Sequence, residues 1–372
     1  MKDPRMTRLA ELLVNYSTKV KKGEKVMISA IDTAAFPLVE ELIEAISQKG
    51  GVPFVTLNTQ AIQRKLYANS DDTMLEILRE TELAKAKMMD AYIGIRALDN
   101  KYELSDIPQE KMMAVMNKYR KDISDEIVGN TKWCGLAFPT PGFAQASEMS
   151  MEAFENFFFN VCTLDYPKMD RAMDAMVTLM EKTDKVRILG PGKTDLTFSI
   201  KGLPPIKCAG EYNIPDGEIF TAPVKNSVNG IIEYNTPSIY LGTKFENITL
   251  TFKDGKIVDF TGSNQEKLEE IFNIDEGARF VGEFAIGVNP YITKPMINIL
   301  FDEKIAGSIH FTPGKAYDEC DNGNSSAIHW DLVLIQTPEY GGGELYFDDV
   351  LIRKDGLFVI PELEKLNPEN LK

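Results

Sequence analysis

Two histidines, the only ones among 372 residues, stand close together in the chain as His310 and His329. The second lies in segment 327–335, whose aliphatic and β-branched residues predict a strand. Because side chains two positions apart on a strand point to the same face, we expect His329 and Asp331 to project together. An imidazole beside a carboxylate suits a divalent ion such as zinc. The spacing therefore predicts a metal site; the alternative is that the histidines only satisfy hydrogen bonds in the core.

Four acidic residues stand in contexts that are unusual for the protein surface and could add ligands. Glu218 follows a turn and enters a short apolar stretch, and Glu283 lies inside a glycine-punctuated apolar run. Asp302 and Glu303 directly follow another apolar segment. A site with two metal ions needs about five or six ligands, typically with one carboxylate that bridges both ions. For each of these acids, a solvated position at the edge of the fold is the alternative.

Composition describes a folded protein that is long enough for two domains. The chain is 44% hydrophobic and 26% charged, with a formal net charge of −15. That charge argues against nucleic acid and anionic membrane surfaces as partners. We expect neither a signal peptide nor a membrane-spanning segment. The cysteines are widely spaced and indicate reduced thiols in the cytoplasm rather than a disulfide framework: Cys134, Cys162, Cys208 and Cys320.

Helical and strand-like segments alternate through the first half of the chain, which predicts an α/β domain over residues 1–184 with an open, mostly parallel sheet. Leu9, Leu12, Leu13 and Tyr16 have the spacing of an amphipathic helix. The remaining pattern predicts strands at 26–30, 52–57, 91–95 and 133–138, and helices at 35–47, 72–86, 109–121, 150–161 and 166–182.

The second half, residues 185–372, has the pattern of a β-rich α+β domain that contains both histidines. Strands are predicted at 186–189, 195–200, 230–234, 245–252, 256–261 and 341–352, with one helix at 266–272. Asp254 and Gly255 predict the turn of a hairpin. The segment Gly190-Pro-Gly-Lys-Thr194 resembles the end of a phosphate-binding loop, but Arg187 stands where that motif needs glycine. Nucleotide binding is therefore not predicted.

An ordered series of motifs resembles the aminopeptidase T family of metallo-aminopeptidases. In the second half the series is IPDGEIFTAP (214–223), SVNG (227–230), GEFAIGVN (282–289), FDE (301–303), IH (309–310) and NSSAIHWD (324–331). In the first half, PTPGFAQA (139–146) and MSMEAF (149–154) extend it. The resemblance covers most of the chain. It implies a similar two-domain fold, a homodimer whose active sites face a restricted cavity, and peptides with a free N-terminus as substrates.

The resemblance also assigns the site. It implies two divalent ions per chain, as zinc, cobalt or manganese, held by Glu218, Glu283, Glu303, His310, His329 and Asp331. Asp302 is the alternative to its neighbour Glu303. The family's catalytic tyrosine falls on Tyr317, for which packing in a surface loop is the alternative. The loop between the two histidines is shorter than in longer members of the family, which leaves the shape of the substrate pocket open.

The implied reaction is hydrolysis of the N-terminal peptide bond. Metal ions would activate the water, and Tyr317 would stabilise the oxyanion of the tetrahedral intermediate. A carboxylate among Glu218, Glu283 and Glu303 would pass the proton to the leaving amine, with Glu283 taken as catalytic. Two other classes stay open: a different two-metal hydrolase, such as an amidase or phosphoesterase, and a non-catalytic protein that binds metal or peptide.

Overall fold

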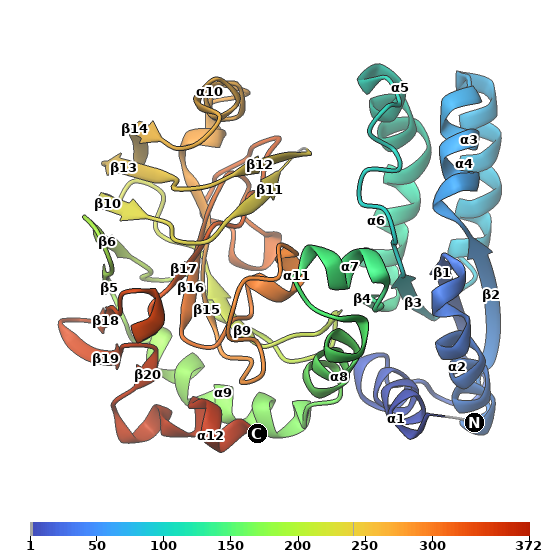
Figure 1. The fold of residues 1–372 in the computed structure, drawn as a ribbon, viewed down its shortest axis with the longest axis horizontal. Coiled ribbons are helices and arrows are strands. Elements are labelled where there is room, and N and C mark those ends of the chain that lie inside the picture. Colours follow the sequence, from blue (N-terminus) through green and yellow to red (C-terminus); the bar gives the residue numbers. More distant parts are fainter. Residues whose placement is uncertain (1–2, 241) are drawn as a thin grey trace. The chain divides into compact units, whose positions relative to one another are not determined.

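The chain forms two compact units in the computed structural model, which describes residues 3–240 and 242–372 (Figure 1). The first unit holds the chain up to Thr163 and the short segment Gly210–Ile214; the second holds Leu164–Ala209 and Pro215–Lys372. From the sequence we expected the change near residue 184. Helix α9 (Tyr166–Met180) accounts for the difference, because it packs against strands β7 (Ile206–Cys208) and β9 (Glu218–Thr221) of the second unit.

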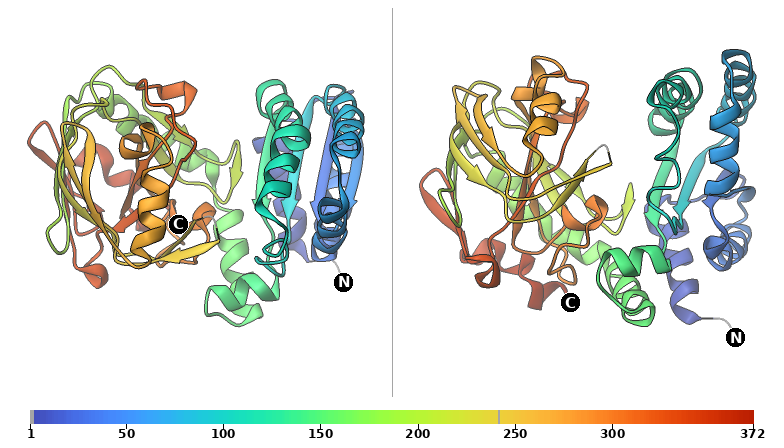
Figure 2. Two further views of the ribbon diagram at one scale, coloured as in Figure 1. Left: turned by 90° about the horizontal axis from the view of Figure 1, so that it is seen from above. Right: turned by 45° about the horizontal axis from the view of Figure 1, so that its top comes forward.

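The first unit is built on a parallel sheet, as predicted. Strands β1 (Lys25–Ile31), β2 (Val52–Asn58), β3 (Ala91–Arg96) and β4 (Lys132–Ala137) lie in the order β2-β1-β3-β4, and β8 (Asn213–Ile214) pairs in parallel with β4. Helices pack around these strands (Figure 2): α1 (Pro4–Leu12), α2 (Phe36–Gln48), α3 (Gln60–Asn69), α4 (Asp72–Ala86), α5 (Gln109–Ala114), α6 (Lys121–Asn130), α7 (Pro141–Ala146) and α8 (Met151–Cys162).

Local sequence explains where these helices begin and what they bury. In α2, Leu38, Leu42 and Ile46 recur at helical spacing and are all buried. The side chain of Asp71 accepts a hydrogen bond from the backbone N–H of Met74 and so caps α4, whose bounds are those predicted. Helix α3, which was not predicted, is capped in the same way by Thr59.

The second unit contains two antiparallel sheets and a short hairpin. The larger sheet has eight strands, in the order β14-β13-β10-β6-β5-β18-β19-β20: β5 (Lys185–Leu189), β6 (Asp195–Ser199), β10 (Asn229–Glu233), β13 (Thr249–Lys253), β14 (Lys256–Thr261), β18 (Glu344–Phe347), β19 (Val350–Lys354) and β20 (Leu357–Phe358). The smaller has the order β17-β16-β15-β9-β7 and adds β15 (Val281–Gly287), β16 (Ser308–Pro313) and β17 (Val333–Ile335).

Three helices and the hairpin complete this unit: α10 (Gln265–Phe272), α11 (Ile299–Asp302) and α12 (Pro368–Leu371), with β11 (Ser238–Tyr240) paired to β12 (Thr243–Phe245). The β-rich architecture is the one predicted. No helix in the described part of the chain is long and apolar enough to cross a membrane.

Phenylalanine rings fill the space between the two larger sheets. The ring centroid of Phe198, on β6, lies 5.0 Å from that of Phe284 on β15 and 4.9 Å from that of Phe311 on β16. Phe252, on β13, approaches Phe311 edge-on. Because side chains alternate along a strand, the neighbours of Phe284 and Phe311 point to the other face of the smaller sheet. That second face carries the candidate site.

Turn residues explain which of the predicted strands form as single strands and which are interrupted. Asp254 and Gly255 have φ of 50° and 84° and close the predicted hairpin between β13 and β14. The strand-like segment predicted at 341–352 forms two strands, because Asp348 and Asp349, with φ of 46° and 64°, turn it into the hairpin β18–β19. The strand predicted at 245–252 is likewise broken, at Asn247 with φ of 54°.

Candidate metal centre

Three neighbouring strands direct polar side chains to one face of the smaller sheet. In the strand register, Ala285 of β15 lies opposite His310 of β16, and Gly287 lies opposite Glu218 of β9. Paired residues point the same way, and so do residues two apart, so Glu283 joins the same face. The small side chains of Ala285 and Gly287 leave room between the larger ones. The sheet thus places two carboxylates and an imidazole around one space.

Glu218, Glu283 and His310 form a first triad of possible ligands. His310 Nε2 lies 3.2 Å from Glu283 Oε1 and 3.5 Å from Glu218 Oε2. All three side chains are buried, and one ligand atom of each lies within 4.8 Å of the others. This is a spacing at which a single cation can contact all three.

Glu283, His329 and Asp331 form a second triad. His329 Nε2 lies 3.1 Å from Glu283 Oε2 and 3.3 Å from Asp331 Oδ1. The expectation that His329 and Asp331 project together is therefore met, although the strand predicted from residue 327 is wrong. Only Val333–Ile335 forms a strand, and His329 makes one isolated bridge to Gly314. Pro313 ends β16 and has no N–H to donate, so the pairing before residue 333 continues only through single backbone hydrogen bonds, such as that from Trp330 N–H to the Pro313 carbonyl.

The two triads share Glu283, with one carboxylate oxygen facing each. Oε1 faces His310 and Oε2 faces His329. Within the described residues, the buried atoms Glu218 Oε2 and His329 Nε2 have no hydrogen-bond partner. Buried polar atoms normally have a hydrogen-bond partner. Two buried atoms without one, at the centre of two ligand triads, are therefore suited to contact bound cations. A carboxylate between two such groups is the arrangement of a bridging ligand.

Neighbouring groups orient the second triad. The backbone carbonyl of Lys315 lies 2.8 Å from His329 Nδ1. Because a carbonyl only accepts, Nδ1 carries the ring proton and Nε2 keeps its lone pair for a metal. The hydroxyl of Thr312 donates to Asp331 Oδ1 over 2.8 Å. Such partners of metal ligands fix their direction and raise affinity.

Gly282 leaves room for the Lys315 carbonyl that accepts the hydrogen bond from His329 Nδ1. A Cβ at this position would lie 2.3 Å from the carbonyl oxygen of Lys315, a distance that real Cβ atoms do not show. We expect Gly282→Ala to displace that carbonyl, tilt the imidazole and lower metal affinity of the second triad by roughly 10–100-fold. Competition with a coloured chelator measures the affinity. Gly129→Ala is the control, since nothing lies within 4 Å of its Cβ; unchanged metal binding in Gly282→Ala would contradict this account.

Glu303 belongs to neither triad but lies beside the first. Its Oε1 is 2.7 Å from Lys304 Nζ, and the same buried ammonium contacts Glu218 Oε1 and lies 3.6 Å from Asp216 Oδ1. Asp302, the alternative to Glu303, accepts the backbone N–H groups of Met296 and Asn298 instead. Of these two adjacent acids, Glu303 is therefore the one that shares partners with the first triad.

Negative charge dominates the site. Burial raises the pKa of Glu303 to about 8. Burial acts to lower the pKa of His310, but the carboxylates of Glu218 and Glu283 raise it to about 9. In the same way Asp331 and Glu283 overcome burial and raise the pKa of His329 to about 11. Without a metal, the carboxylates hold protons on nearby groups, which shows how strongly they favour positive charge.

Tyr317 stands at the edge of this cluster. Its ring centroid lies 4.6 Å from that of His329 and 5.6 Å from that of Phe220, and the residue is 44% exposed. Partial burial and the carboxylate of Glu283 raise the pKa of the phenol well above its ordinary value. The hydroxyl therefore stays protonated at neutral pH and is available as a donor.

Lys304 and Thr312 are site residues that the sequence analysis missed. A lysine after Asp302-Glu303 is ordinarily solvated, and nothing in its neighbours signals that it is only 1% exposed. The threonine could have been found only from the strand register that sets it opposite Glu283.

Comparison with known proteins identifies the family. The profile of the family described as "Thermophilic metalloprotease (M29)" matches residues 2–344. The chain belongs to this metalloprotease family. Among curated relatives, Aminopeptidase 2 of Geobacillus stearothermophilus is 26% identical over 94% of each chain. Aminopeptidase T of Thermus aquaticus is also 26% identical, over 88% of this chain and 92% of the relative.

Two solved structures share the fold over nearly the whole chain. Wild-type AmpT from Thermus thermophilus has a TM-score of 0.78 at 24% identity, covering 96% of this M29 chain and 99% of that one. The 2,5-dihydroxypyridine dioxygenase of Pseudomonas putida has a TM-score of 0.62 at 15% identity, covering 96% and 98%. The two-unit architecture thus occurs in proteins that carry the names of different reactions.

Proposed function

We propose that this metalloprotease is an aminopeptidase that removes the N-terminal residue of peptides with a pair of divalent ions. The observation that carries the proposal is Glu283, whose two oxygens face two separate ligand triads. The family assignment supports peptide hydrolysis, and the matched relatives bear the name aminopeptidase.

The proposed ligands divide between the two ions. Glu218, Glu283 and His310 would hold the first ion, and Glu283, His329 and Asp331 the second. Glu303, the sixth ligand that the resemblance implies, belongs to neither triad. Zinc, cobalt and manganese suit this set of imidazole and carboxylate ligands. Bound ions would supply Lewis acidity and lower the pKa of the attacking water.

We assign proton transfer to Glu303 rather than to Glu283, which we favoured from the sequence. A carboxylate committed to two ions has little basicity left for a proton, whereas Glu303 stands outside both triads. The ammonium of Lys304 holds Glu303 Oε1 in place. Its other oxygen would take a proton from the water and deliver it to the leaving amine nitrogen.

Tyr317 is proposed to donate a hydrogen bond to the oxyanion of the tetrahedral intermediate. We expect Tyr317→Phe to keep its metal and its fold but to lose roughly 100-fold in kcat, the usual scale for one lost oxyanion donor. Steady-state kinetics with metal analysis on the same sample measures both. Tyr102→Phe is the control, because that tyrosine belongs to the first unit and is 57% exposed. A Tyr317→Phe enzyme with wild-type kcat would leave Tyr317 a packing residue.

A free N-terminus is expected to be essential, and this tests the proposed function. The surplus of carboxylates suits the positive charge of an α-ammonium group, which an acetyl cap removes. We expect leucyl-p-nitroanilide to be hydrolysed and its N-acetyl form to lose most of its kcat/KM. A peptide of about ten residues, with and without an N-terminal acetyl group, extends the comparison. Equal rates for capped and free substrates, or internal cleavage first, would favour an endopeptidase or amidase.

Compartment and assembly are further parts of the proposal. We place the protein in the cytoplasm, which agrees with the four widely spaced cysteines and with the absence of a disulfide among the described residues. The homodimer rests on the resemblance to the aminopeptidase T family. Peptides are the proposed partners, and the net charge of −15 disfavours nucleic acid and anionic membranes.

A further inference from the structure

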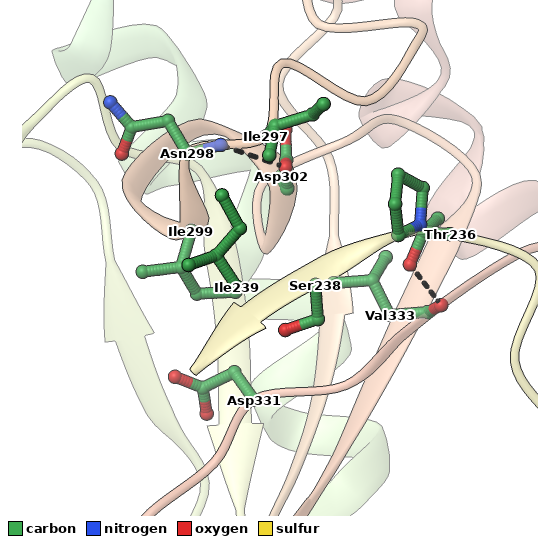
Figure 3. A pocket seen from close by; sticks show the side chains of 10 residues that line it. Thr236, Ser238, Ile239, Ile297, Asn298, Ile299, Asp302, Asp331 and Val333 are labelled. Carbon is green, nitrogen blue, oxygen red and sulfur yellow. Dashed lines mark hydrogen bonds between the residues drawn. The ribbon is translucent and has the colours of Figure 1, made fainter. Parts of the chain in front are cut away.

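A pocket borders the candidate metal centre. Its wall includes the proposed ligand Asp331. Figure 3 shows the side chains that line it, with three isoleucines gathered on one side and Asp331 on another. The lining comes from β11, α11 and segments next to them: Thr236, Pro237, Ser238, Ile239, Ile297, Asn298, Ile299, Asp302, Asp331 and Val333.

Aliphatic side chains give this pocket its character. Ile239 and Ile299 are 36% and 43% exposed, so their apolar surface faces open space. Ile297 and the buried Val333 also line the pocket. Apolar surface left in water gains free energy when a ligand covers it. The pocket therefore favours an occupant with an aliphatic surface.

Three polar side chains of the pocket are already engaged. Asp302 accepts the backbone N–H groups of Met296 and Asn298 over 2.6 and 3.1 Å. Ser238 Oγ accepts the indole N–H of Trp330, and the hydroxyl of Thr236 donates to the carbonyl of Val333. An occupant with hydrogen-bonding groups would find few free partners here, whereas an apolar one loses none.

Asp302 also holds the backbone that presents Ile297. This residue has φ of 53°, in the left-handed region that a β-branched residue rarely occupies. Strained conformations of this kind persist where the surroundings hold them and cluster at ligand sites. Here the two hydrogen bonds of Asp302 bracket Ile297 on both sides. The carboxylate thus fixes one wall of the pocket.

We propose that this pocket receives the side chain of the substrate's N-terminal residue and selects aliphatic residues such as leucine. The inference rests on the proposed aminopeptidase function, because it needs the scissile carbonyl to lie at the metal centre. That carbonyl and the side chain are attached to the same Cα, so the side chain must enter a space next to the ligands. The pocket that Asp331 borders meets this condition.

Charged and very small side chains fit this pocket less well than aliphatic ones. Acidic side chains find no partner of opposite charge, because the lining residues include no Lys or Arg. Basic side chains gain little, since Asp302 is satisfied by backbone N–H groups and Asp331 by Thr312 and the proposed ion. Glycine and alanine leave the isoleucine wall uncovered.

Product amino acids test the pocket separately from catalysis. Calorimetry of the zinc-loaded full chain would compare binding of free leucine and free alanine, and leucine is expected to bind more tightly. In Ile299→Ala, the ratio of leucine to alanine affinity should fall by roughly 10-fold or more, the scale of a lost contact in an apolar pocket. Ile299→Trp should fill the pocket and weaken leucine more than alanine. Ile274→Ala is the control, since Ile274 is 53% exposed and lies outside the lining.

Hydrolysis of leucyl-, alanyl-, glutamyl- and lysyl-p-nitroanilide by the same variants then separates the two proposals. A parallel fall in the leucyl-to-alanyl ratio of kcat/KM supports the pocket. If wild-type protein hydrolyses none of these but still prefers leucine through Ile299, the proposed function fails and the pocket stands. If both ratios are unchanged in Ile299→Ala and Ile299→Trp, the inference is overturned whether or not the protein is active.

Discussion

Replacing Glu283 by glutamine is expected to empty both metal positions together and to abolish peptide hydrolysis. The carboxylate faces His310 with one oxygen and His329 with the other, so a single change removes a ligand from each triad. A neutral amide binds a divalent ion weakly, and its NH₂ group would point at one of the two positions. The loss should exceed the roughly 10–100-fold effect typical of residues that only support a ligand.

Single-site variants provide the comparison for Glu283→Gln. Asp331→Asn changes the second triad alone, and Glu218→Gln the first alone. Each should lower metal content from two ions to one, whereas Glu283→Gln should lower it to none at the same free metal concentration. Plasma emission analysis counts the ions, and circular dichroism confirms that each variant is folded. Two ions retained in Glu283→Gln would refute a shared ligand.

Chelation is expected to remove all activity, and zinc, cobalt or manganese should restore it. The same treatment should lower the melting temperature, because ions that bind only the folded state stabilise it. At a metal concentration about 100 times Kd the gain is roughly 2.7 kcal/mol per ion. Without ions, the carboxylates of Glu218, Glu283 and Asp331, of which the first two are buried, repel one another.

Calorimetric scans before chelation, after it and after metal is added back measure this stabilisation alongside the rate. Magnesium is the matched control ion, since it favours oxygen ligands and octahedral geometry over imidazole. An enzyme that is fully active and equally stable after exhaustive chelation would exclude a metal-dependent mechanism.

The periodicity of apolar residues predicted most helices and strands of the first unit, because each of these segments buries one face. Helix α4 forms over the predicted residues, and strands β1 to β4 lie within a residue or two of their predicted bounds. Prediction was weaker where tertiary contacts decide the outcome. Helix α9 has a sequence pattern like that of the helices before it, yet it belongs to the second unit because it packs against β7 and β9.

The site was predictable only in part, for similar reasons. The pattern His329-Trp330-Asp331 could be interpreted from the sequence alone, because side chains two residues apart in an extended backbone point to the same side. Glu218 and Glu283 are 65 residues apart in sequence, so their meeting depends on the register of β9 against β15. The part assigned to Tyr317 came from family resemblance, because a tyrosine in a loop has no distinguishing pattern.

We expect the proposed reaction to depend on one face of the smaller sheet rather than on the fold as a whole. The likeness to both an AmpT and a 2,5-dihydroxypyridine dioxygenase shows that this architecture accompanies more than one named chemistry. In this chain the proposed ligands lie around Ala285 and Gly287 of β15. Experiments on those side chains therefore decide the function more directly than further comparison of folds.

Lys304, buried beneath the first triad, sets the electrical balance of the whole centre. Five carboxylates converge there, from Asp216, Glu218, Glu283, Glu303 and Asp331, and one ammonium partly offsets them. Four negative charges remain, which two divalent ions would cancel. A single divalent ion would leave two charges uncompensated in a buried environment, where an unpaired charge is costly. Protons held on His329 and Glu303, whose pKa values the site raises, offset that charge instead. Filling the second position must displace such protons, so the second ion should bind more weakly as the pH falls.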